Sequence, residues 1–328
     1  MARIGVLSTA HVHTDAYLDL LGGFEGVDLA GVADDDAERG RATADEHGVP
    51  FRPADDLLDA ADGAVVCSTN ADHEAWVERA ADAGVDVLCE KPLAPTLAGA
   101  ERIRDAVADA GVNAGVAMPL RFCDPAREAN DALDAGAIGA LRSVVGTNRG
   151  QFPGGWFADP DAAGGGAVQD HTVHIVDLVG WLTGRRVAEV HAETASRLHD
   201  VPVEDVNVLS MELDDGTQFT LDGSWSRPDG FRFWGDATLE LLGEAGRIDV
   251  DCFDQTLTRT REDTDLVFWG TDPNRGMLED FVAAVREDRT PETTLAEGRD
   301  AVAVVEAAYE SAERGEPVAV RYPSNSGR

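Results

Sequence analysis

Short apolar runs alternate with longer helical stretches over the first 120 residues, and this alternation limits the possible folds more than any other feature. The runs expected to form buried strands are 4–7, 28–33, 64–67, 85–89 and 112–117. The stretches with helical spacing or composition are 12–22, 36–46, 72–83 and 96–110. Strands that alternate with helices of about 10–15 residues indicate βαβ units. We therefore predict an α/β fold that begins with a doubly wound parallel sheet of the Rossmann type.

The pattern changes after Met118, where we predict a second domain. The elements expected there are helices at 123–135, 169–183, 275–287 and 296–313 and a long strand near 141–150. Several alternating strands fill 186–268, and the Asp-Asp-Gly sequence at 214–216 predicts a hairpin turn between two of them. The predicted organisation is a Rossmann domain over 1–120, followed over 121–328 by an α/β domain with a large open, mostly antiparallel sheet.

The charge balance argues against several classes of partner. The chain has 62 acidic and 27 basic residues, with a net charge of −35. Such a surface repels phosphate backbones and anionic membranes, so we expect binding to neither nucleic acid nor membrane. Acid excess with a single lysine resembles the composition of a halophile's cytoplasmic protein, whose self-repulsion is screened at high salt.

Cysteine usage and the apolar runs predict a cytoplasmic protein. The four cysteines show no CxxC spacing, so we expect buried thiols in a reducing compartment. The first residues lack a cleavage-like segment, and no apolar run approaches the about 18 residues of a transmembrane helix. Only the tail at 322–328 is expected to be loose.

The turn after the first strand is a degraded dinucleotide fingerprint. A G-x-G-x-x-G motif would place glycines where this chain has Ser8, Ala10 and His13. The two small residues still let a backbone approach a pyrophosphate at the helix N-terminus, whereas His13 prevents a tight helix–strand contact. The turn is therefore either a cofactor site or an ordinary βα turn. His11 and His13 are either ligands or simply exposed, and exposure is the preferred interpretation.

Asp34 ends the second predicted strand, where a carboxylate accepts the hydrogen bonds of an adenosine ribose diol. The same carboxylate would repel a 2′-phosphate, and Asp35 and Asp36 add to that repulsion. Arg39 is the only base nearby. The motif therefore favours NAD over NADP, although an Asp-rich turn is also typical of a helix N-cap.

The Cys89-Glu90-Lys91-Pro92 sequence ends the fourth predicted strand, at the sheet edge where doubly wound folds bind ligands. Lys91 is the only lysine of the chain, and the other 26 basic residues are arginine. Arginine can replace lysine in surface roles but cannot release a proton at neutral pH. We therefore predict a functional amine at Lys91, against the alternative that one lysine survived by chance.

Three glycines at 164–166 precede a predicted helix that carries several polar side chains. Asp170 and His174 are four residues apart and share one helix face, and Asp177 follows on the same side. A histidine with a carboxylate one turn away is typical of an oriented general base. The alternative is that Asp170 caps the helix and His174 is a core histidine. His171 completes a DHxxH spacing, but we predict no metal because no third ligand is evident.

Together these motifs resemble those of the glucose–fructose oxidoreductase, myo-inositol dehydrogenase and MocA (Gfo/Idh/MocA) family. The resemblance covers nearly the whole chain. It is carried by EKP at 90–92, CSTNADH at 67–73, PLRF at 119–122, the glycine-rich stretch at 164–174 and the two closing helical segments. It implies a Rossmann domain, a nicotinamide cofactor and a polyhydroxylated substrate. It also implies a homodimer or homotetramer assembled through the open sheet of the second domain.

The resemblance also implies roles for individual residues. Lys91, Asp170 and His174 match the family's catalytic lysine, aspartate and histidine, and the Lys91–Pro92 bond is often cis in relatives. The residues predicted to bind the cofactor are Ser8, Thr9, Ala10, Asp34, Ser68, Thr69, Asn70, His73, Glu90 and Lys91. Those predicted to bind the substrate are Lys91, Arg121, Asp170, His171 and His174, although the resemblance does not say what Arg121 does.

The predicted activity is an NAD(P)-dependent oxidoreductase that transfers a hydride between a secondary hydroxyl of a sugar, cyclitol or polyol and the nicotinamide. NAD is the expected cofactor, with NADP less favoured. Two alternatives remain: an NAD-dependent glycosidase of the same fold, and a non-catalytic ligand-sensing regulator. Substrate specificity is expected from the aromatic loops at 152–161 and 225–234.

Overall fold

The structure is a computed structural model. It describes residues 1–328 except 232, 255, 261–263, 269 and 324–328, and side chains are not described over 255–269. Most of the tail expected to be loose therefore lies outside the described residues. The chain forms two compact units. Unit 1 comprises Met1–Met118, Asp159–Gly164 and Asn274–Val302, and unit 2 comprises the rest of the chain.

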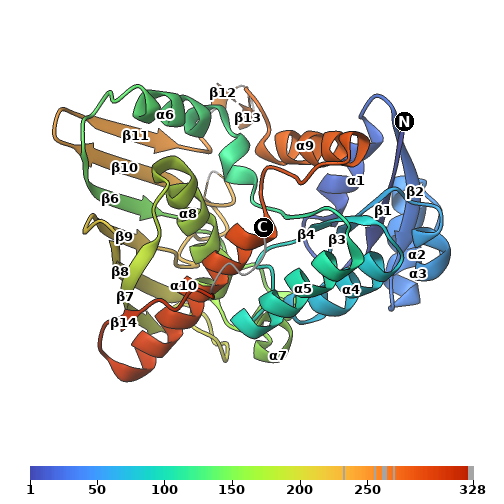
Figure 1. Cartoon of the computed structure of the whole chain (residues 1–328), viewed down its shortest axis with the longest axis horizontal. Coiled ribbons are helices and arrows are strands. Elements are labelled where there is room, and N and C mark those ends of the chain that lie inside the picture. Colours follow the sequence, from blue (N-terminus) through green and yellow to red (C-terminus); the bar gives the residue numbers. More distant parts are fainter. Residues whose placement is uncertain (232, 255, 261–263, 269, 324–328) are drawn as a thin grey trace. The chain divides into compact units, whose positions relative to one another are not determined.

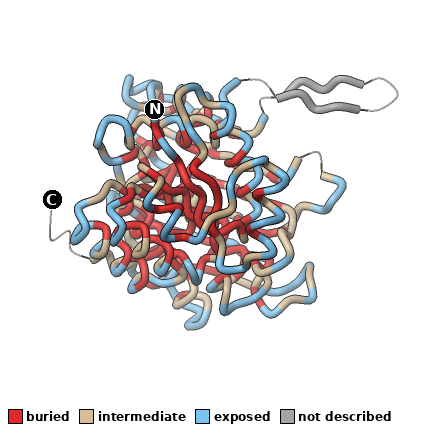
Figure 2. Tube along the Cα trace, turned by 90° about the vertical axis from the view of Figure 1, so that its right-hand side faces the viewer, coloured by how far each residue is buried: buried red, intermediate tan, exposed pale blue. Residues whose placement is uncertain are grey.

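Unit 1 is built on a five-stranded parallel sheet in the order β2-β1-β3-β4-β5 (Figure 1). The strands are β1 (Ala2–Leu7), β2 (Val27–Ala33), β3 (Gly63–Val66), β4 (Asp86–Cys89) and β5 (Ala114–Val116). Parallel strands are covered on both faces, which is why they occur in the sequence as continuous apolar runs. Figure 2 shows the strand that starts near the N-terminus as mostly buried, in agreement with Ile4, Val6 and Leu7.

Helices connect the strands of this sheet, and all of them were predicted except the short α3 (Ala54–Leu58). They are α1 (Thr14–Gly22), α2 (Ala37–His47), α3 (Ala54–Leu58), α4 (His73–Asp82) and α5 (Leu97–Ala110). The direction in which the chain adds strands reverses between β1 and β3. In doubly wound sheets, ligands bind outside the carboxyl ends of the strands at such a switch point. The turns after β1, β3 and β4 all end at this edge.

Two later segments return to unit 1, which differs from the predicted organisation of 1–120 and 121–328. Residues 159–164, which include α7 (Pro160–Ala163), and residues 274–302 both pack there. The second segment contains most of α9 (Pro273–Glu287) and the start of α10 (Leu295–Arg314). Gly63 of β3 shows how closely α9 packs, because a Cβ atom at this glycine would lie 2.8 Å from Val285.

Unit 2 is built on a seven-stranded mixed sheet in the order β11-β10-β6-β9-β8-β7-β14. All neighbouring strands are antiparallel except the β6–β9 pair. The strands are β6 (Leu141–Thr147), β7 (Val187–Ala195), β8 (Val206–Leu213), β9 (Gln218–Asp222), β10 (Thr238–Gly243), β11 (Arg247–Asp251) and β14 (Val318–Ala319). A separate antiparallel pair joins β12 (Thr256–Thr260) and β13 (Thr264–Phe268).

One face of the mixed sheet is covered by the helix that carries the predicted catalytic pair. This helix is α8 (Ala167–Thr183), and α6 (Asp124–Asp134) lies beside it. A Cβ atom at Gly146 of β6 would lie 2.8 Å from the Ile175 side chain of α8, so the glycine permits this close packing. Apolar side chains also remain about half-exposed on the sheet strands, at Val145, Val208 and Leu242.

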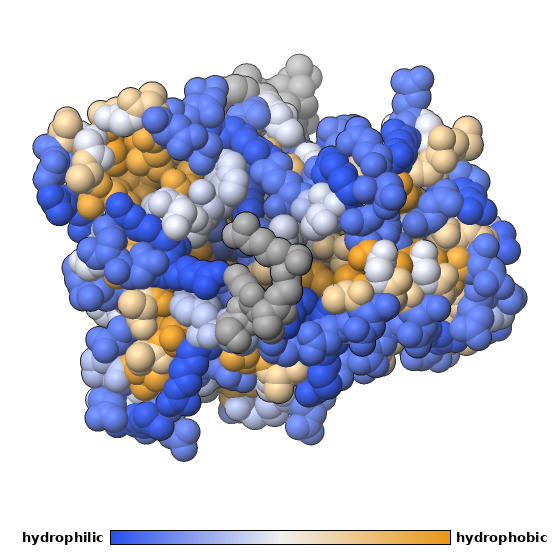
Figure 3. Space-filling model, in the orientation of Figure 1, coloured by the Kyte–Doolittle hydropathy of each residue, from blue (hydrophilic) through white to orange (hydrophobic). Residues whose placement is uncertain are grey.

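The predicted parallel and mostly antiparallel sheets are thus both confirmed. Hydrophilic residues dominate the face shown in Figure 3, as the acidic composition requires. Within the described residues, no helix combines the length and the apolar character needed to cross a membrane.

Candidate active site

The turn after β1 has the backbone geometry that the fingerprint glycine would provide. Ser8 has a φ of 60°, in the left-handed region that favours glycine. Its amide donates a 2.7 Å hydrogen bond to the carbonyl oxygen of Ala33 in β2, and the residue is buried. The degraded motif therefore keeps the tight turn, at the cost of backbone strain at a residue that has a Cβ atom.

Asp34 is held in place at the end of β2 by several donors. Its carboxylate accepts hydrogen bonds from the Thr9 amide at 2.6 Å, the Thr9 hydroxyl at 2.7 Å and the Asp36 amide at 2.8 Å. Arg39 adds a two-point contact, with Nε at 3.0 Å and Nη2 at 2.7 Å. Burial alone would raise the pKa of Asp34, but the Arg39 and Thr9 hydrogen bonds outweigh it and lower that pKa. The N-cap of α2 is Asp36, so capping does not account for Asp34.

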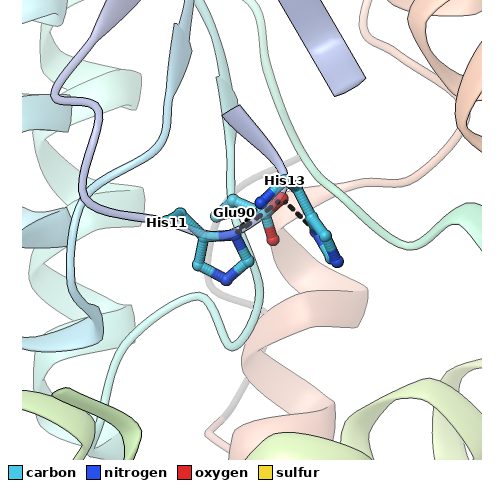
Figure 4. Close-up of side chains that lie close together, drawn as sticks. All are labelled: His11, His13 and Glu90. Carbon is cyan, nitrogen blue, oxygen red and sulfur yellow. Dashed lines mark hydrogen bonds and ion pairs between the residues drawn. The ribbon is translucent and has the colours of Figure 1, made fainter. Parts of the chain in front are cut away.

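His11, His13 and Glu90 form a compact cluster at the same sheet edge (Figure 4). His11 was expected to be exposed, but this expectation is wrong, because only 2% of the residue is accessible. The turn carries His11 over the end of β3, where its amide donates to the Cys67 carbonyl at 2.9 Å. The His13 side chain is one-third exposed, and its Nδ1 donates to Glu90 Oε1 at 2.9 Å.

The protonation states within this cluster follow from burial and charge. Burial lowers the pKa of His11 to about 3, despite the nearby carboxylate of Glu90. Burial alone would raise the pKa of Glu90, but His11, His13 and Lys91 together hold it well below the usual range. At neutral pH the cluster therefore contains an ionised carboxylate and a neutral imidazole at His11.

Lys91 follows Glu90 directly and lies in a rigid turn. It is 5% exposed, its amide donates to Glu90 Oε2 at 3.0 Å, and the Lys91–Pro92 peptide bond is cis, as the resemblance implied. His73 is fully buried and donates from Nδ1 to the Pro92 carbonyl at 2.9 Å. Burial lowers the pKa of His73, so its ring is neutral at neutral pH.

The turn after β3 contributes the remaining predicted cofactor residues. Ser68 donates to the Thr69 carbonyl, and the Thr69 hydroxyl donates to Asp72. Asn70 is buried and donates from Nδ2 to the Ala163 carbonyl at 2.8 Å. Within the described part of the chain, Asn70 Oδ1 and His73 Nε2 are buried without a hydrogen-bond partner. These two atoms, the strained turn at Ser8 and the carboxylate of Asp34 give the sheet edge the features that a dinucleotide requires.

In unit 2, the N-terminal half of α8 presents the predicted acid and base. Asp170 is 5% exposed, and its Oδ2 accepts a 3.0 Å hydrogen bond from the indole nitrogen of Trp225. The N-cap of α8 is Gly166, so the alternative reading of Asp170 as the cap is wrong. His174 is partly exposed, which also argues against a fully buried core histidine. The four-residue spacing places Asp170 and His174 on one face of α8.

His171 lies deeper than its neighbours. Its ring is fully buried, with Nδ1 donating to the Gly223 carbonyl at 2.9 Å and Nε2 lying 3.2 Å from Asp170 Oδ2. The ring also makes edge contacts with Trp225 and Trp234. The structure thus places this predicted substrate residue in a buried position beside Asp170, with its ring fixed by the Gly223 carbonyl and the two indoles.

Arg121 forms a buried two-point ion pair with Asp177 of α8. Arg121 Nε donates to Asp177 Oδ2 at 2.8 Å, and Nη2 contacts Oδ1. Both side chains are at most 2% exposed. Arg121 is one of the predicted substrate-binding residues, for which the resemblance gives no more specific role. In the structure its guanidinium ties the Pro119–Phe122 turn to α8.

Two residues that sequence analysis missed secure the start of α8. Glu204 accepts hydrogen bonds from the Gly166 and Val168 amides and from the Tyr309 hydroxyl, the last at 2.8 Å. Burial raises the pKa of Glu204 in spite of these donors. In a chain with 62 acidic residues, nothing in the sequence distinguishes this carboxylate.

A parallel sheet with these turns at its carboxyl edge defines a dinucleotide-binding oxidoreductase, and comparison with known proteins agrees. Residues 2–118 match the model of the oxidoreductase family with an NAD-binding Rossmann fold, and residues 126–249 match the GFO/IDH/MocA C-terminal domain. The chain belongs to the Gfo/Idh/MocA family. The predicted family, fold and oxidoreductase activity are thereby confirmed.

Two relatives and one solved structure resemble the chain over nearly its whole length. A D-xylose 1-dehydrogenase (NADP(+)) from Haloferax volcanii is 30% identical over 96% of this chain and 98% of its own. An inositol 2-dehydrogenase from Saccharopolyspora erythraea is 30% identical over 97% of this chain and 96% of its own. The crystal structure of GenD2 from gentamicin A biosynthesis, in complex with NAD, has a TM-score of 0.87 at 26% identity. The match covers 98% of this chain and 96% of GenD2.

Proposed function

We propose that this protein reversibly oxidises a secondary hydroxyl of a sugar, cyclitol or related polyol, with NAD as the preferred cofactor. The observation that carries the proposal is the chain's single lysine, buried at the carboxyl edge of a parallel sheet beside an ionised Glu90. An amine in this position serves a chemical purpose that arginine cannot. The dehydrogenases named above support the choice of substrate class.

Three side chains have proposed roles in this reaction. His174 accepts the hydroxyl proton as the alcohol becomes a ketone and returns it in the reverse direction. The Lys91 ammonium donates a hydrogen bond to the reacting oxygen and stabilises its developing negative charge. Asp170, held by Trp225, orients His174 or a neighbouring substrate hydroxyl. A nicotinamide bound in unit 1 would supply the hydride acceptor for the oxidation and the hydride donor for the reverse reaction.

Residues of unit 1 would hold the dinucleotide. The small residues Ser8, Thr9 and Ala10 would let the β1–α1 turn approach the pyrophosphate closely, while the Ser8 and Thr9 amides stay bonded to the Ala33 carbonyl and the Asp34 carboxylate. Asp34 would accept the ribose hydroxyls, while Ser68, Thr69, Asn70, His73 and Glu90 would line the rest of the site. Arg39 now occupies the Asp34 carboxylate, and its 41% exposed side chain has room to move aside.

Substitutions in the two units test the mechanism. Lys91→Ala and His174→Ala should each lower kcat by at least about 100-fold, because each removes a proton-handling or charge-stabilising group. Binding of NAD, followed by fluorescence quenching, should remain within a few-fold of the wild type for His174→Ala. Unchanged turnover in both Lys91→Ala and His174→Ala would refute the assignment.

A substrate panel distinguishes the proposed dehydrogenase from its alternatives. Pentoses, hexoses, cyclitols and sugar acids are offered with NAD and NADP in parallel, in molar KCl, and reduced cofactor is followed by absorbance. Net formation of reduced cofactor supports a dehydrogenase. Cleavage of a glycoside without net reduction indicates a glycosidase, and tight ligand binding without turnover indicates a sensor.

The preference for NAD is tested separately, because Arg39 could alternatively pair with a 2′-phosphate. We expect kcat/KM to favour NAD by at least about tenfold, since the acidic turn at 34–36 repels that phosphate. Asp34→Ser should lower kcat/KM for NAD and so reduce the ratio of kcat/KM for NAD to that for NADP. A wild-type enzyme that favours NADP would overturn this part of the proposal.

We also propose a cytoplasmic, salt-adapted homo-oligomer. Half-exposed Val145, Val208 and Leu242 on the strands of the unit 2 sheet supply the apolar surface for a partner copy. Sedimentation velocity in molar KCl should show a dimer or tetramer, and a combined Val145→Lys and Val208→Lys variant should shift it to monomer. A wild-type monomer at micromolar concentration would contradict the proposal.

A further inference from the structure

The His11, His13 and Glu90 cluster has a composition that neither the fold nor the proposed reaction requires. Two imidazoles and one carboxylate meet where the β1–α1 turn passes the end of β4, and their ligand atoms all lie within 4.8 Å of one another (Figure 4). Two histidines with one carboxylate are a donor set typical of zinc and other divalent transition metals.

The distances within the cluster suit a small metal ion. His11 Nδ1 lies 3.6 Å from Glu90 Oε1, and His13 Nδ1 lies 2.9 Å from the same oxygen. Zinc bonds of about 2.0–2.2 Å in tetrahedral geometry separate ligand atoms by roughly 3.3–3.5 Å. The first distance is about 0.1 Å longer than this range, whereas the second is shorter and requires His13 to move by a few tenths of an ångström. The His13 side chain is one-third exposed, which leaves it room to do so.

His11 and Glu90 already face each other with electron-rich atoms. His11 Nδ1 accepts a 3.2 Å hydrogen bond from the His13 amide, so this nitrogen carries a lone pair rather than a proton. Glu90 Oε2 is engaged by the Lys91 amide, which leaves Oε1 directed at the two histidines. A cation bound by this nitrogen and by the carboxylate oxygen 3.6 Å away would take the lone pair that the His13 amide now occupies, so binding releases that hydrogen bond.

The surrounding structure holds the ligands in place. The Thr14 hydroxyl donates to the His11 carbonyl at 2.8 Å, and the His11 amide is bonded to Cys67. The buried Tyr17 hydroxyl lies 3.4 Å from His13 Nδ1. Such outer contacts orient metal ligands and tune their affinity.

We propose that His11, His13 and Glu90 bind one divalent transition-metal ion of the zinc type. On binding, the ion replaces the proton on His13 Nδ1, and this proton is released to solvent. Three protein ligands leave a fourth coordination position for water or another oxygen donor. The ion would fasten the β1–α1 turn to the end of β4, and so brace the turn whose fingerprint glycines are missing.

Metal stoichiometry tests the proposal with a readout that does not depend on enzyme activity. Full-length protein is stripped with a chelator, loaded with ZnCl2, and dialysed in molar KCl with excess Mg2+ to suppress binding to surface carboxylates. The wild type should retain one zinc per chain by elemental analysis. Its Co2+-loaded form should show visible d–d bands typical of tetrahedral coordination, and zinc should raise its Tm.

Matched variants separate this site from adventitious binding. His11→Ala and His13→Gln should each weaken zinc binding by at least about 100-fold and abolish the zinc-dependent rise in Tm. His47→Ala is the control, because His47 also sits between two carboxylates, those of Asp15 and Asp19, but on the surface. It should retain one zinc per chain.

His13→Gln is the informative variant if His11→Ala does not fold, since His13 is only partly buried. The proposal is overturned if the wild type retains no stoichiometric zinc, or if folded His13→Gln keeps the wild-type stoichiometry and affinity. Neither result would bear on the oxidoreductase reaction, which is followed through the nicotinamide.

Discussion

At the scale of single residues, the chain keeps the geometry of a dinucleotide turn while changing its side chains. Ser8 adopts the left-handed conformation in place of glycine, and His13 fills the position where glycine would allow close packing. His13 instead reaches Glu90, so the turn gains a polar contact with β4 in exchange for a tight helix–strand approach. The local sequence predicted the turn, but not the burial of His11, because His11 contacts Cys67 and Glu90, which are distant in sequence.

Substitution of Ser8 tests the strain in this turn. Ser8→Val should lower the free energy of unfolding by about 1–2 kcal/mol or more, because a β-branched side chain is strongly disfavoured at positive φ. Ser8→Gly should stay within about 1 kcal/mol of the wild type, since relief of strain offsets the greater chain entropy of glycine. Urea denaturation in molar KCl measures both. Equal stability of the Val and Gly variants would show that the turn is not strained.

At the scale of elements, α8 carries most of the predicted site residues of unit 2, and side chains from several other segments bind to it. Glu204 and Tyr309 hold its first turn, Trp225 holds Asp170, and Arg121 holds Asp177. The sequence predicted the helix and its shared face, because both follow from local spacing. It could not predict Trp225, Glu204 or Arg121 as partners, because each comes from a separate segment that meets α8 only through packing.

Breaking the Arg121–Asp177 pair should destabilise the protein strongly, whereas replacing both side chains with apolar ones should destabilise it little. Asp177→Ala should destabilise the protein by about 3–5 kcal/mol, because it leaves the buried Arg121 guanidinium without its carboxylate. The double variant Arg121→Met, Asp177→Leu should recover most of that loss, since apolar side chains of similar size avoid the cost of burying charge. Denaturation midpoints of the three proteins decide the matter. A double variant less stable than Asp177→Ala would show that the pair itself is strongly stabilising.

Glu204 should make the stability of unit 2 depend on pH in a defined direction. Its pKa is raised by folding, so the folded state binds the proton more tightly than the unfolded state does. The stabilisation is therefore present below the ordinary pKa near 4.5 and is lost as pH rises through the raised pKa of the folded state. Relative to Glu204→Gln, the wild type should lose stability over this range in urea melts. A relative gain with rising pH would contradict the assigned shift.

Tyr309→Phe tests the same capping contact without adding or removing a charge. Loss of the hydroxyl donor to a buried carboxylate should cost about 1.5–3 kcal/mol. If the contact positions α8, the variant should also lower kcat more than it changes KM for the cofactor. Combined with Glu204→Gln it should cost less than the sum of the two single effects, because the two side chains share one hydrogen bond.

At the scale of the whole molecule, local sequence was informative about each unit but not about which segments compose it. The five strands of unit 1 could be predicted from continuous apolar runs, because parallel strands are covered on both faces. The five-residue α3 has too few turns to show a period, and it was missed. The return of 159–164 and 274–302 to unit 1 has no local signature, since it depends on contacts such as that of α9 with Gly63.

Net charge is a property of the whole molecule, and it leads to the last prediction. A charge of −35 on 328 residues opposes the compact state by self-repulsion, and salt at about 1 M shortens the screening length to roughly 3 Å. Raising KCl from about 0.1 to 2 M should therefore raise Tm by several degrees. A variant with exposed Glu46, Asp82, Asp109 and Glu313 changed to their amides should need less salt to reach the same Tm. Sucrose at matched osmolality serves as the control for solvent exclusion, because it leaves the charge repulsion unscreened. A Tm that is independent of KCl, or that rises as much with sucrose, would show that charge does not set the salt requirement of this fold.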